Sequence, residues 1–226
     1  MGTTVYTLDV EGYAPEIVAL TRPLLARWVD KIGATLHVIA DRRFPDWPPV
    51  YEKLQIHDLA RRRGDDWSIF IDADALVHPD FFDPTNHIPR DTVAHNGCDM
   101  AGMRWRYDEY FKRDGRNIGS CNWFAVASSW CRDLWRPLDD LTFAEAVERI
   151  YPVQVELHSI ITRDHLIDDY TLSRNIARFG LKFKTVLQII KETGFSDDTG
   201  FLWHQYMLTP AQKVEEMHKI LDAWKV

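Results

Sequence analysis

The stretch Trp67-Ser-Ile-Phe-Ile-Asp72-Ala-Asp74-Ala-Leu-Val77 joins an apolar run to two carboxylates. An apolar run without alternation is typical of a strand buried on both faces of a parallel sheet. We therefore expect a strand over residues 68–77, with Asp72 and Asp74 near its carboxyl end. In an extended backbone, side chains two residues apart point to the same side, so the two carboxylates would lie together.

Two ionised carboxylates beside a buried strand need a positive charge, because burying them unpaired is costly. One hard divalent cation, which prefers oxygen ligands, would provide that charge. The alternative is that one aspartate caps the next turn and the other is solvated. Asp-x-Asp alone does not decide between these interpretations, because the tripeptide is common. The surrounding sequence favours the metal.

The composition is that of a globular protein, with 46% hydrophobic and 27% charged residues in 226. This length fits one domain over residues 1–226 with a substantial core. We see no apolar run of membrane-spanning length and no secretory signal pattern, so we expect no membrane span. The three cysteines lack C-x-x-C spacing. A disulfide framework is therefore not expected, and a cytoplasmic location fits best.

The formal net charge of −7 argues against a broad nucleic-acid-binding surface. Positive charge is concentrated only locally, at residues 61–63 and in a loop over residues 104–116. The loop also carries aromatic residues, a mixture that suits stacking on sugars or on single-stranded bases. A nucleic-acid partner is therefore a secondary alternative.

The first half of the chain alternates between strand and helix patterns. Strands are expected at residues 5–10 and 35–40, before the one at 68–77, and helices at 14–32 and 50–63, ended by Gly33 and Gly64. This order predicts an α/β fold with a central, mostly parallel sheet flanked by helices. Asp72 and Asp74 would then lie outside the carboxyl ends of the strands, where open α/β sheets bind ligands.

The second half is less regular. Strands are expected at residues 99–105 and 123–128, helices at 142–150, 168–179 and 210–224, and extended chain at 181–190. Asp140 or Thr142 would cap the first of these helices.

Four segments of the chain form a set with a distinctive order. They are Thr7-Leu-Asp9-Val-Glu-Gly-Tyr13, Tyr51-Glu-Lys53-Leu-Gln-Ile56 with the aspartate stretch after it, Leu166-Ile-Asp168-Asp169-Tyr-Thr-Leu172, and Phe201-Leu-Trp-His204-Gln-Tyr206. Together they resemble the GT-A fold glycosyltransferases, above all the retaining, metal-dependent galactosyl- and glucosyltransferases that use UDP-sugars. The likeness reaches both ends of the chain and implies a GT-A (Rossmann-like) single domain.

The resemblance implies transfer of a hexose, glucose or galactose, from a UDP-sugar to a hydroxyl of a glycan, protein or small molecule. It also implies a metal site made of Asp72, Asp74 and His204. An imidazole ligand favours Mn²⁺ over Mg²⁺, which prefers oxygen ligands. His158 and His165 are the alternatives for the third ligand.

The resemblance also implies a donor site. Thr7, Asp9 and Tyr13 would hold the uracil and ribose. Lys53 would reach the donor or one of the acidic residues, although a surface lysine paired with a neighbouring acid is the alternative.

The chain departs from the family at two places. Where the family has Asn-Ala-Gly or a close relative, this chain reads Gly-Ser120-Cys-Asn122, so Ser120 or Asn122 would contact the donor sugar. The lysine and tryptophan with which the family grips the diphosphate are missing after His204. Lys213 lies nearby but out of register.

Asp169, with Asp168 second, is the candidate catalytic residue that orients the acceptor or the sugar. Either aspartate could instead be only a helix N-cap, for which aspartate is favoured. Retention is expected from the resemblance, with the leaving diphosphate taking the proton of the acceptor. An inverting enzyme would need a carboxylate as general base.

Three other functions are considered. Haloacid-dehalogenase-like phosphatases also place Asp-x-Asp after an apolar strand, but after the first strand and with Thr or Val where this chain has Leu76. A GT-A-like module could bind nucleotide-sugar or glycan without turnover, although it would not need three metal ligands. A glycosyltransferase acting on hydroxymethylated DNA bases would use the basic loop.

Overall fold

The computed structural model describes residues 2–96, 122–150, 163–194, 202–204 and 208–226. Within these ranges a six-stranded sheet has the order β2-β1-β3-β6-β5-β7. Strand β6 runs antiparallel to both of its neighbours, and the other pairs are parallel. The strands are β1 (Thr3–Leu8), β2 (Thr35–Ile39), β3 (Trp67–Ile71), β5 (Thr92–His95), β6 (Trp123–Ala127) and β7 (Lys182–Thr185). The predicted α/β fold with a mostly parallel sheet is confirmed.

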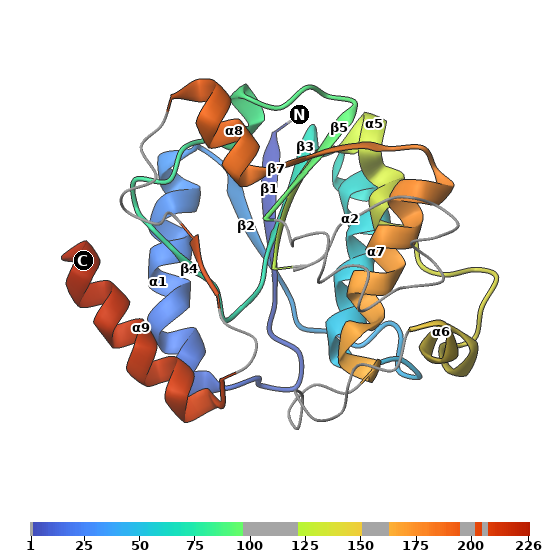
Figure 1. The fold of residues 1–226 in the computed structure, drawn as a ribbon, viewed down its shortest axis with the longest axis horizontal. Helices are drawn as coiled ribbons and strands as arrows, with labels where there is room; N and C mark the ends of the chain where they lie inside the picture. The colour runs from blue at the N-terminus through green and yellow to red at the C-terminus, as the bar shows by residue number, and fades with distance from the viewer. Residues whose placement is uncertain (1, 97–121, 151–162, 195–201, 205–207) are drawn as a thin grey trace.

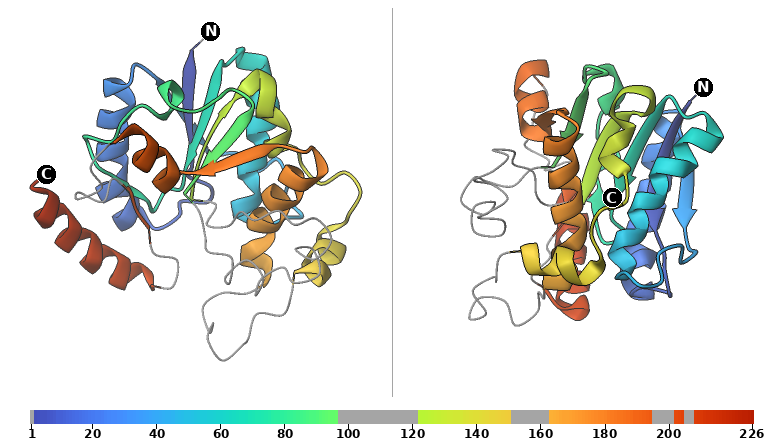
Figure 2. Two further views of the ribbon diagram at one scale, coloured as in Figure 1. Left: turned by 45° about the horizontal axis from the view of Figure 1, so that its top comes forward. Right: turned by 90° about the vertical axis from the view of Figure 1, so that its right-hand side faces the viewer.

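Helices cover both faces of this sheet (Figures 1 and 2). On one side lie α1 (Pro15–Lys31) and α8 (Val186–Thr193), and α9 (Pro210–Trp224) packs on the outside of α1. On the other side lie α2 (Ile56–Arg63) and α7 (Ile167–Arg178). The short elements are η1 (Pro49–Gln55), η2 (Pro84–Asn86), α5 (Ser128–Cys131), η3 (Arg132–Trp135), α6 (Phe143–Arg149) and η5 (Arg163–Leu166).

Strand β3 shows why the sheet is buried on both faces. Ile69 and Ile71 belong to the apolar core on the α1 side, whereas Phe70 belongs to the core on the α2 side. All three side chains are fully buried. The continuous apolar run of this strand is therefore the signature of a strand covered by helices on both sides.

The predicted strand over residues 68–77 is wrong in its second half. The strand ends at Ile71, and a turn follows in which the Ala75 N–H donates to the Asp72 carbonyl at 3.1 Å. The chain then resumes as β4 (Leu76–Val77), which pairs antiparallel with β8 (Leu202–Trp203) in a separate two-stranded sheet. This local bond and bonds from Asp72 and Ala73 to distant residues hold the turn, and an apolar run in the sequence does not reveal them.

The extended chain predicted over residues 181–190 is also half wrong. After β7, Thr185 forms a capping box with Gln188 and begins α8, which ends at Gly194 with φ +71°. Reciprocal bonds of this kind satisfy the free N–H groups at a helix start. The local capping signal outweighs the β-branched, apolar composition of the segment.

Most of the other predicted elements are present with shifted ends, such as β1, which was expected at residues 5–10, but strand β5 (Thr92–His95) and the short helices η2, α5 and η3 were not predicted. The helix expected over 14–32 is α1 (Pro15–Lys31), and α9 covers the predicted range 210–224. Gly33 and Gly64, with positive φ, follow α1 and α2. The helix expected over 50–63 begins as the 3₁₀ helix η1 and continues as α2. Thr142, not Asp140, caps α6. The strand expected at 99–105 and the basic loop lie outside the described residues, and the single-domain organisation stays a prediction.

None of the described helices has both the length and the apolarity that crossing a bilayer requires.

A buried histidine should make the fold sensitive to acid. His95 is 1% exposed at the end of β5, beside Phe124 and Phe183, and its ring nitrogens have no hydrogen-bond partner within the described residues. Burial lowers the pKa of His95 to about 4, against a smaller opposing effect of Asp169. In the unfolded chain the same histidine has a pKa of about 6.5. As the pH falls, the unfolded chain therefore takes up a proton before the folded protein does.

We predict that this difference in proton uptake lowers the free energy of unfolding by about 2 kcal/mol when the pH falls from 7 to 5. Urea unfolding of the wild type and of His95→Phe at both pH values measures it, because the variant keeps a ring but cannot titrate. An equal pH dependence in the two proteins would contradict the prediction.

Candidate functional site

The turn after β3 fixes two carboxylates at the carboxyl end of the sheet. The Asp72 N–H donates to the Asn122 carbonyl at 2.9 Å, which ties the turn to the beginning of β6. The Thr21 hydroxyl of α1 donates to the Ala73 carbonyl at 2.6 Å. Asp72 and Asp74 therefore project from a turn that is anchored on both sides.

A histidine from the far end of the chain joins these carboxylates. Because β8 pairs with β4, His204 follows Trp203 next to the turn. Its Nε2 atom lies 3.3 Å from Asp74 Oδ1 and 4.0 Å from Asp72 Oδ2. One ligand atom from each of the three residues fits within 4.8 Å of the others. The predicted metal ligands are thus brought together.

This donor set fits one divalent cation. Two carboxylates and a neutral imidazole are ligands of Mn²⁺, and ligand atoms about 2.1 Å from one ion lie about 3 to 4 Å apart. The three side chains need only small movements to reach that spacing. We therefore regard Mn²⁺ or Mg²⁺ as compatible with this site.

Lys53 lies at the centre of a buried charge network. Its ammonium contacts Asp168 Oδ2 at 2.6 Å and Asp72 Oδ1 at 3.3 Å, and it lies over the Phe70 ring. The side chain is only 1% exposed. Lys53 thus contacts acidic residues, one of its two expected roles, and is not a surface lysine.

A second ammonium comes from the C-terminal helix. Lys213 of α9 is 6% exposed and donates to Asp74 Oδ2. The Tyr13 hydroxyl donates to the same oxygen at 3.3 Å. Asp74 therefore meets Lys213 and Tyr13 with one oxygen and His204 with the other.

The surroundings of Asp72 and Asp74 shift the pKa values of the two carboxyl groups in opposite directions. Burial raises the pKa of Asp72, and the Lys53 ammonium offsets this only in part. Burial acts in the same direction on Asp74, but His204 and Lys213 outweigh it and hold its pKa well below the ordinary value. Asp74 is therefore the carboxylate that stays ionised.

Asp168 and Asp169 lie in the first turn of α7, and each is 6% exposed. Neither is the N-cap, which is Leu166, so the capping alternative is wrong for both. Burial raises the pKa of Asp168 to about 6, although Lys53 opposes the shift. Asp168, one of the two predicted acceptor residues, is thus connected to Asp72 through the buried Lys53.

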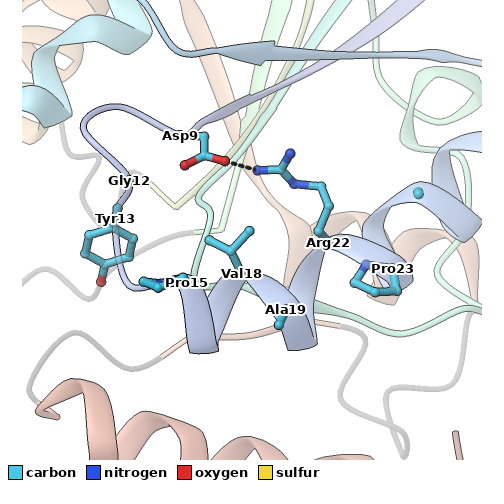
Figure 3. Close-up of a pocket in the computed structure, with 9 residues that line it drawn as sticks. Asp9, Gly12, Tyr13, Pro15, Val18, Ala19, Arg22 and Pro23 are labelled. Atoms are coloured by element: carbon cyan, nitrogen blue, oxygen red, sulfur yellow. Dashed lines mark hydrogen bonds and ion pairs between the residues drawn. The ribbon is translucent and has the colours of Figure 1, made fainter.

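A cavity of about 460 Å³ opens beside the loop after β1 (Figure 3). Asp9 lies on its wall and pairs with Arg22 of α1 at 3.3 Å. Tyr13, which contacts Asp74, also lines it. The other lining residues are Gly12, Pro15, Val18, Ala19, Pro23 and Ala26. Two of the three predicted nucleoside residues therefore share one cavity.

The remaining predicted residues are placed differently. Thr7 is fully buried, away from the surface of that cavity, and its hydroxyl has no partner in the described part of the chain. Asn122 is 4% exposed, and its side-chain oxygen is likewise unpartnered there. His165 is exposed on η5 and lies outside the metal group. Ser120 and His158 lie outside the described residues.

The sequence did not reveal the roles of Lys213, Thr21 and Arg22 at this site. Each lies on a helix with no distinguishing neighbour in sequence. The only sequence signal for Lys213 is its positive charge at a position close to His204. Its contact with Asp74 joins two residues that lie 139 positions apart in the sequence.

Neither a protein-family model nor a curated protein sequence matches the chain. Solved structures do. One is a glycosyltransferase involved in the glycosylation of the major capsid of PBCV-1, with a TM-score of 0.52 and 9% identity over 97% of this chain and 100% of that one. The GT-A fold predicted from the sequence is confirmed. The glycosyltransferase GlyE of Streptococcus pneumoniae TIGR4 matches with a TM-score of 0.45 and 11% identity over 98% of this chain and 62% of that one.

Removing the buried ammonium of Lys53 should destabilise this GT-A fold. Lys53→Met leaves Asp168 and Asp72 without their shared cation, and breaking such a buried pair costs about 3 kcal/mol or more. Urea unfolding at pH 7 measures the loss, with the exposed Lys31→Met as the control.

The double variant Lys53→Met/Asp168→Asn should recover part of this loss, because it removes one of the stranded charges. A loss below about 1 kcal/mol for Lys53→Met would contradict the role of Lys53 as the internal cation.

Proposed function

We propose that this protein is a metal-dependent glycosyltransferase that moves a hexose, glucose or galactose, from a UDP-sugar to a hydroxyl acceptor. The observation that carries the proposal is the convergence of Asp72, Asp74 and His204 at the end of β3. The likeness of the fold to a solved glycosyltransferase supports it.

Asp72, Asp74 and His204 would hold Mn²⁺, or Mg²⁺ as the alternative. The bound ion would supply a Lewis acid for the negative charge that develops on the leaving diphosphate. The low pKa of Asp74 suits this task, because a ligand must be deprotonated before it binds a metal. The imidazole of His204 favours Mn²⁺.

The cavity beside Asp9 and Tyr13 would hold the nucleoside of the donor. Tyr13 lines this cavity and also contacts Asp74, so a nucleoside there would direct its phosphates to the metal ligands. The Asp9 carboxylate can accept bonds from hydroxyl or imide groups, and Arg22 keeps it in place. Asn122, next to Asp72, would contact the sugar.

The acceptor would bind on the side of α7. Asp169 would orient its hydroxyl, whereas Asp168 is held by Lys53 and would serve mainly to fix that turn. Retention, proposed from the family resemblance, needs no separate general base. A glycan, protein or small molecule could supply the hydroxyl.

A donor screen tests the reaction class. We expect slow nucleotide release from UDP-glucose or UDP-galactose in the presence of Mn²⁺, less from GDP-mannose or UDP-GlcNAc, and none after EDTA. Donor binding by calorimetry without release or transfer would instead identify a binding module.

Asp74→Asn should lower Mn²⁺-stimulated nucleotide release by about a hundredfold or more, because it removes one metal ligand and one negative charge. His204→Ala should raise the Mn²⁺ concentration needed for half-maximal release. Asp80→Asn is the matched control, since Asp80 is exposed and pairs only with Lys31 in the described structure. Unchanged release in Asp74→Asn would remove the proposed metal role of that residue.

A further inference from the structure

Asp74 already has a cation in this structure. Lys213 donates to its Oδ2 atom from the first turn of α9, and the lysine side chain is 8% exposed. His204 faces the other oxygen, Oδ1, at 3.3 Å. A metal ion that binds Asp74 must therefore share this carboxylate with an ammonium group or displace it.

The charges show why displacement is favoured. Three carboxylates, those of Asp72, Asp74 and Asp168, face two ammonium groups, those of Lys53 and Lys213. A divalent ion would change the formal charge of this group from −1 to +1, and an ion on Asp74 would lie close to the ammonium that already contacts this carboxylate, where repulsion between like charges is strong. Movement of one lysine away from its carboxylate would relieve this repulsion.

Lys213 is the lysine that is able to leave. Lys53 is held by a second carboxylate, Asp168, at 2.6 Å. Lys213 has no second acidic partner within the described ranges. The helix that carries it stays in place, because Met217 of α9 packs in an apolar cluster with Ile17 and Leu24 of α1. Only the flexible side chain of Lys213 needs to move.

We propose that Lys213 is an internal counter-ion that occupies Asp74 until a metal displaces it and that then pairs with the phosphates of the donor. The proposal rests on the metal site of the proposed function. The ammonium stays within a side-chain length of the ion, where the diphosphate brings new negative charge. Lys213 thereby weakens the binding of the metal in the absence of nucleotide and strengthens it when nucleotide is bound. The binding of the metal and the binding of the nucleotide thus become coupled.

The test is the affinity for Mn²⁺, measured by electron paramagnetic resonance with and without UDP. Without UDP, Lys213→Met should bind Mn²⁺ about tenfold more tightly than the wild type, because the competing charge is gone. The factor by which UDP tightens Mn²⁺ binding should be about tenfold smaller in the variant. Lys219→Met, an exposed lysine on the same helix, should match the wild type in both measurements.

An equal or weaker Mn²⁺ affinity of Lys213→Met without UDP would overturn the proposal. Asp74→Asn separates this result from a failure of the metal site itself. If Asp74→Asn abolishes Mn²⁺ binding and Lys213→Met does not strengthen it, only the role of Lys213 is wrong. If Asp74→Asn leaves Mn²⁺ binding unchanged, the metal site and the role of Lys213 both fail.

A second measurement uses the wild type alone, in case the variant does not fold. Acetylation with an activated ester, read by mass spectrometry, reports how accessible each lysine is. Lys213 should be protected in the metal-free protein, reactive with Mn²⁺, and protected again with Mn²⁺ and UDP. Lys219 should react equally in all three states. Protection of Lys213 that Mn²⁺ does not change would contradict displacement.

Discussion

One half-buried and one buried carboxylate that must be neutralised organise this molecule. Asp72 and Asp74 lie at the end of β3, and each is matched by an ammonium group, from Lys53 and Lys213 respectively. Leaving either carboxylate ionised and unpaired would be costly, because burial disfavours the charged form. The elements that carry the two lysines, η1 and α9, are therefore held against the carboxyl end of the sheet.

The same constraint connects the parts of the proposed reaction. Lys53 extends the network to Asp168 and so to the first turn of α7, where the acceptor residues are proposed. Tyr13 extends it to the cavity beside Asp9, where the nucleoside is proposed. A change of charge at the proposed metal ligands would therefore act electrostatically on both of the proposed substrate sites.

Much of this arrangement could be predicted from the sequence, because it depends on local pattern. The apolar run before Asp72 identified a strand covered on both faces, and the four spaced motifs predicted that His204 would join the aspartates. The turn at Asp72 to Ala75 was missed, because an apolar residue after the second aspartate looks like a continuing strand. The local bond from Ala75 to Asp72, and the pairing of β4 with β8, cannot be seen in periodicity.

Other contacts were not predicted from local pattern, because they join distant residues of ordinary type; the family resemblance implied only that Lys53 would reach the donor or one of the acidic residues. Lys53 and Asp168 are separated by 115 residues, and only the packing of η1 against α7 brings them together. Lys213 belongs to a helix whose amphipathic pattern is visible in the sequence. That pattern does not predict that this lysine is buried in the first turn of the helix. For helix α8 the sequence carries two conflicting signals, because Thr185 and Gln188 have the spacing of a capping box whereas the β-branched, apolar residues around them favour a strand.

The central claim is that Asp72, Asp74 and His204 hold one divalent ion next to a nucleotide. Crystals grown with Mn²⁺ and UDP, measured at the manganese absorption edge, test it most directly. We expect one anomalous peak within about 2.3 Å of all three side chains, with diphosphate oxygens completing the shell. A bound nucleotide with no manganese between these residues, or manganese held elsewhere in the chain, would contradict it.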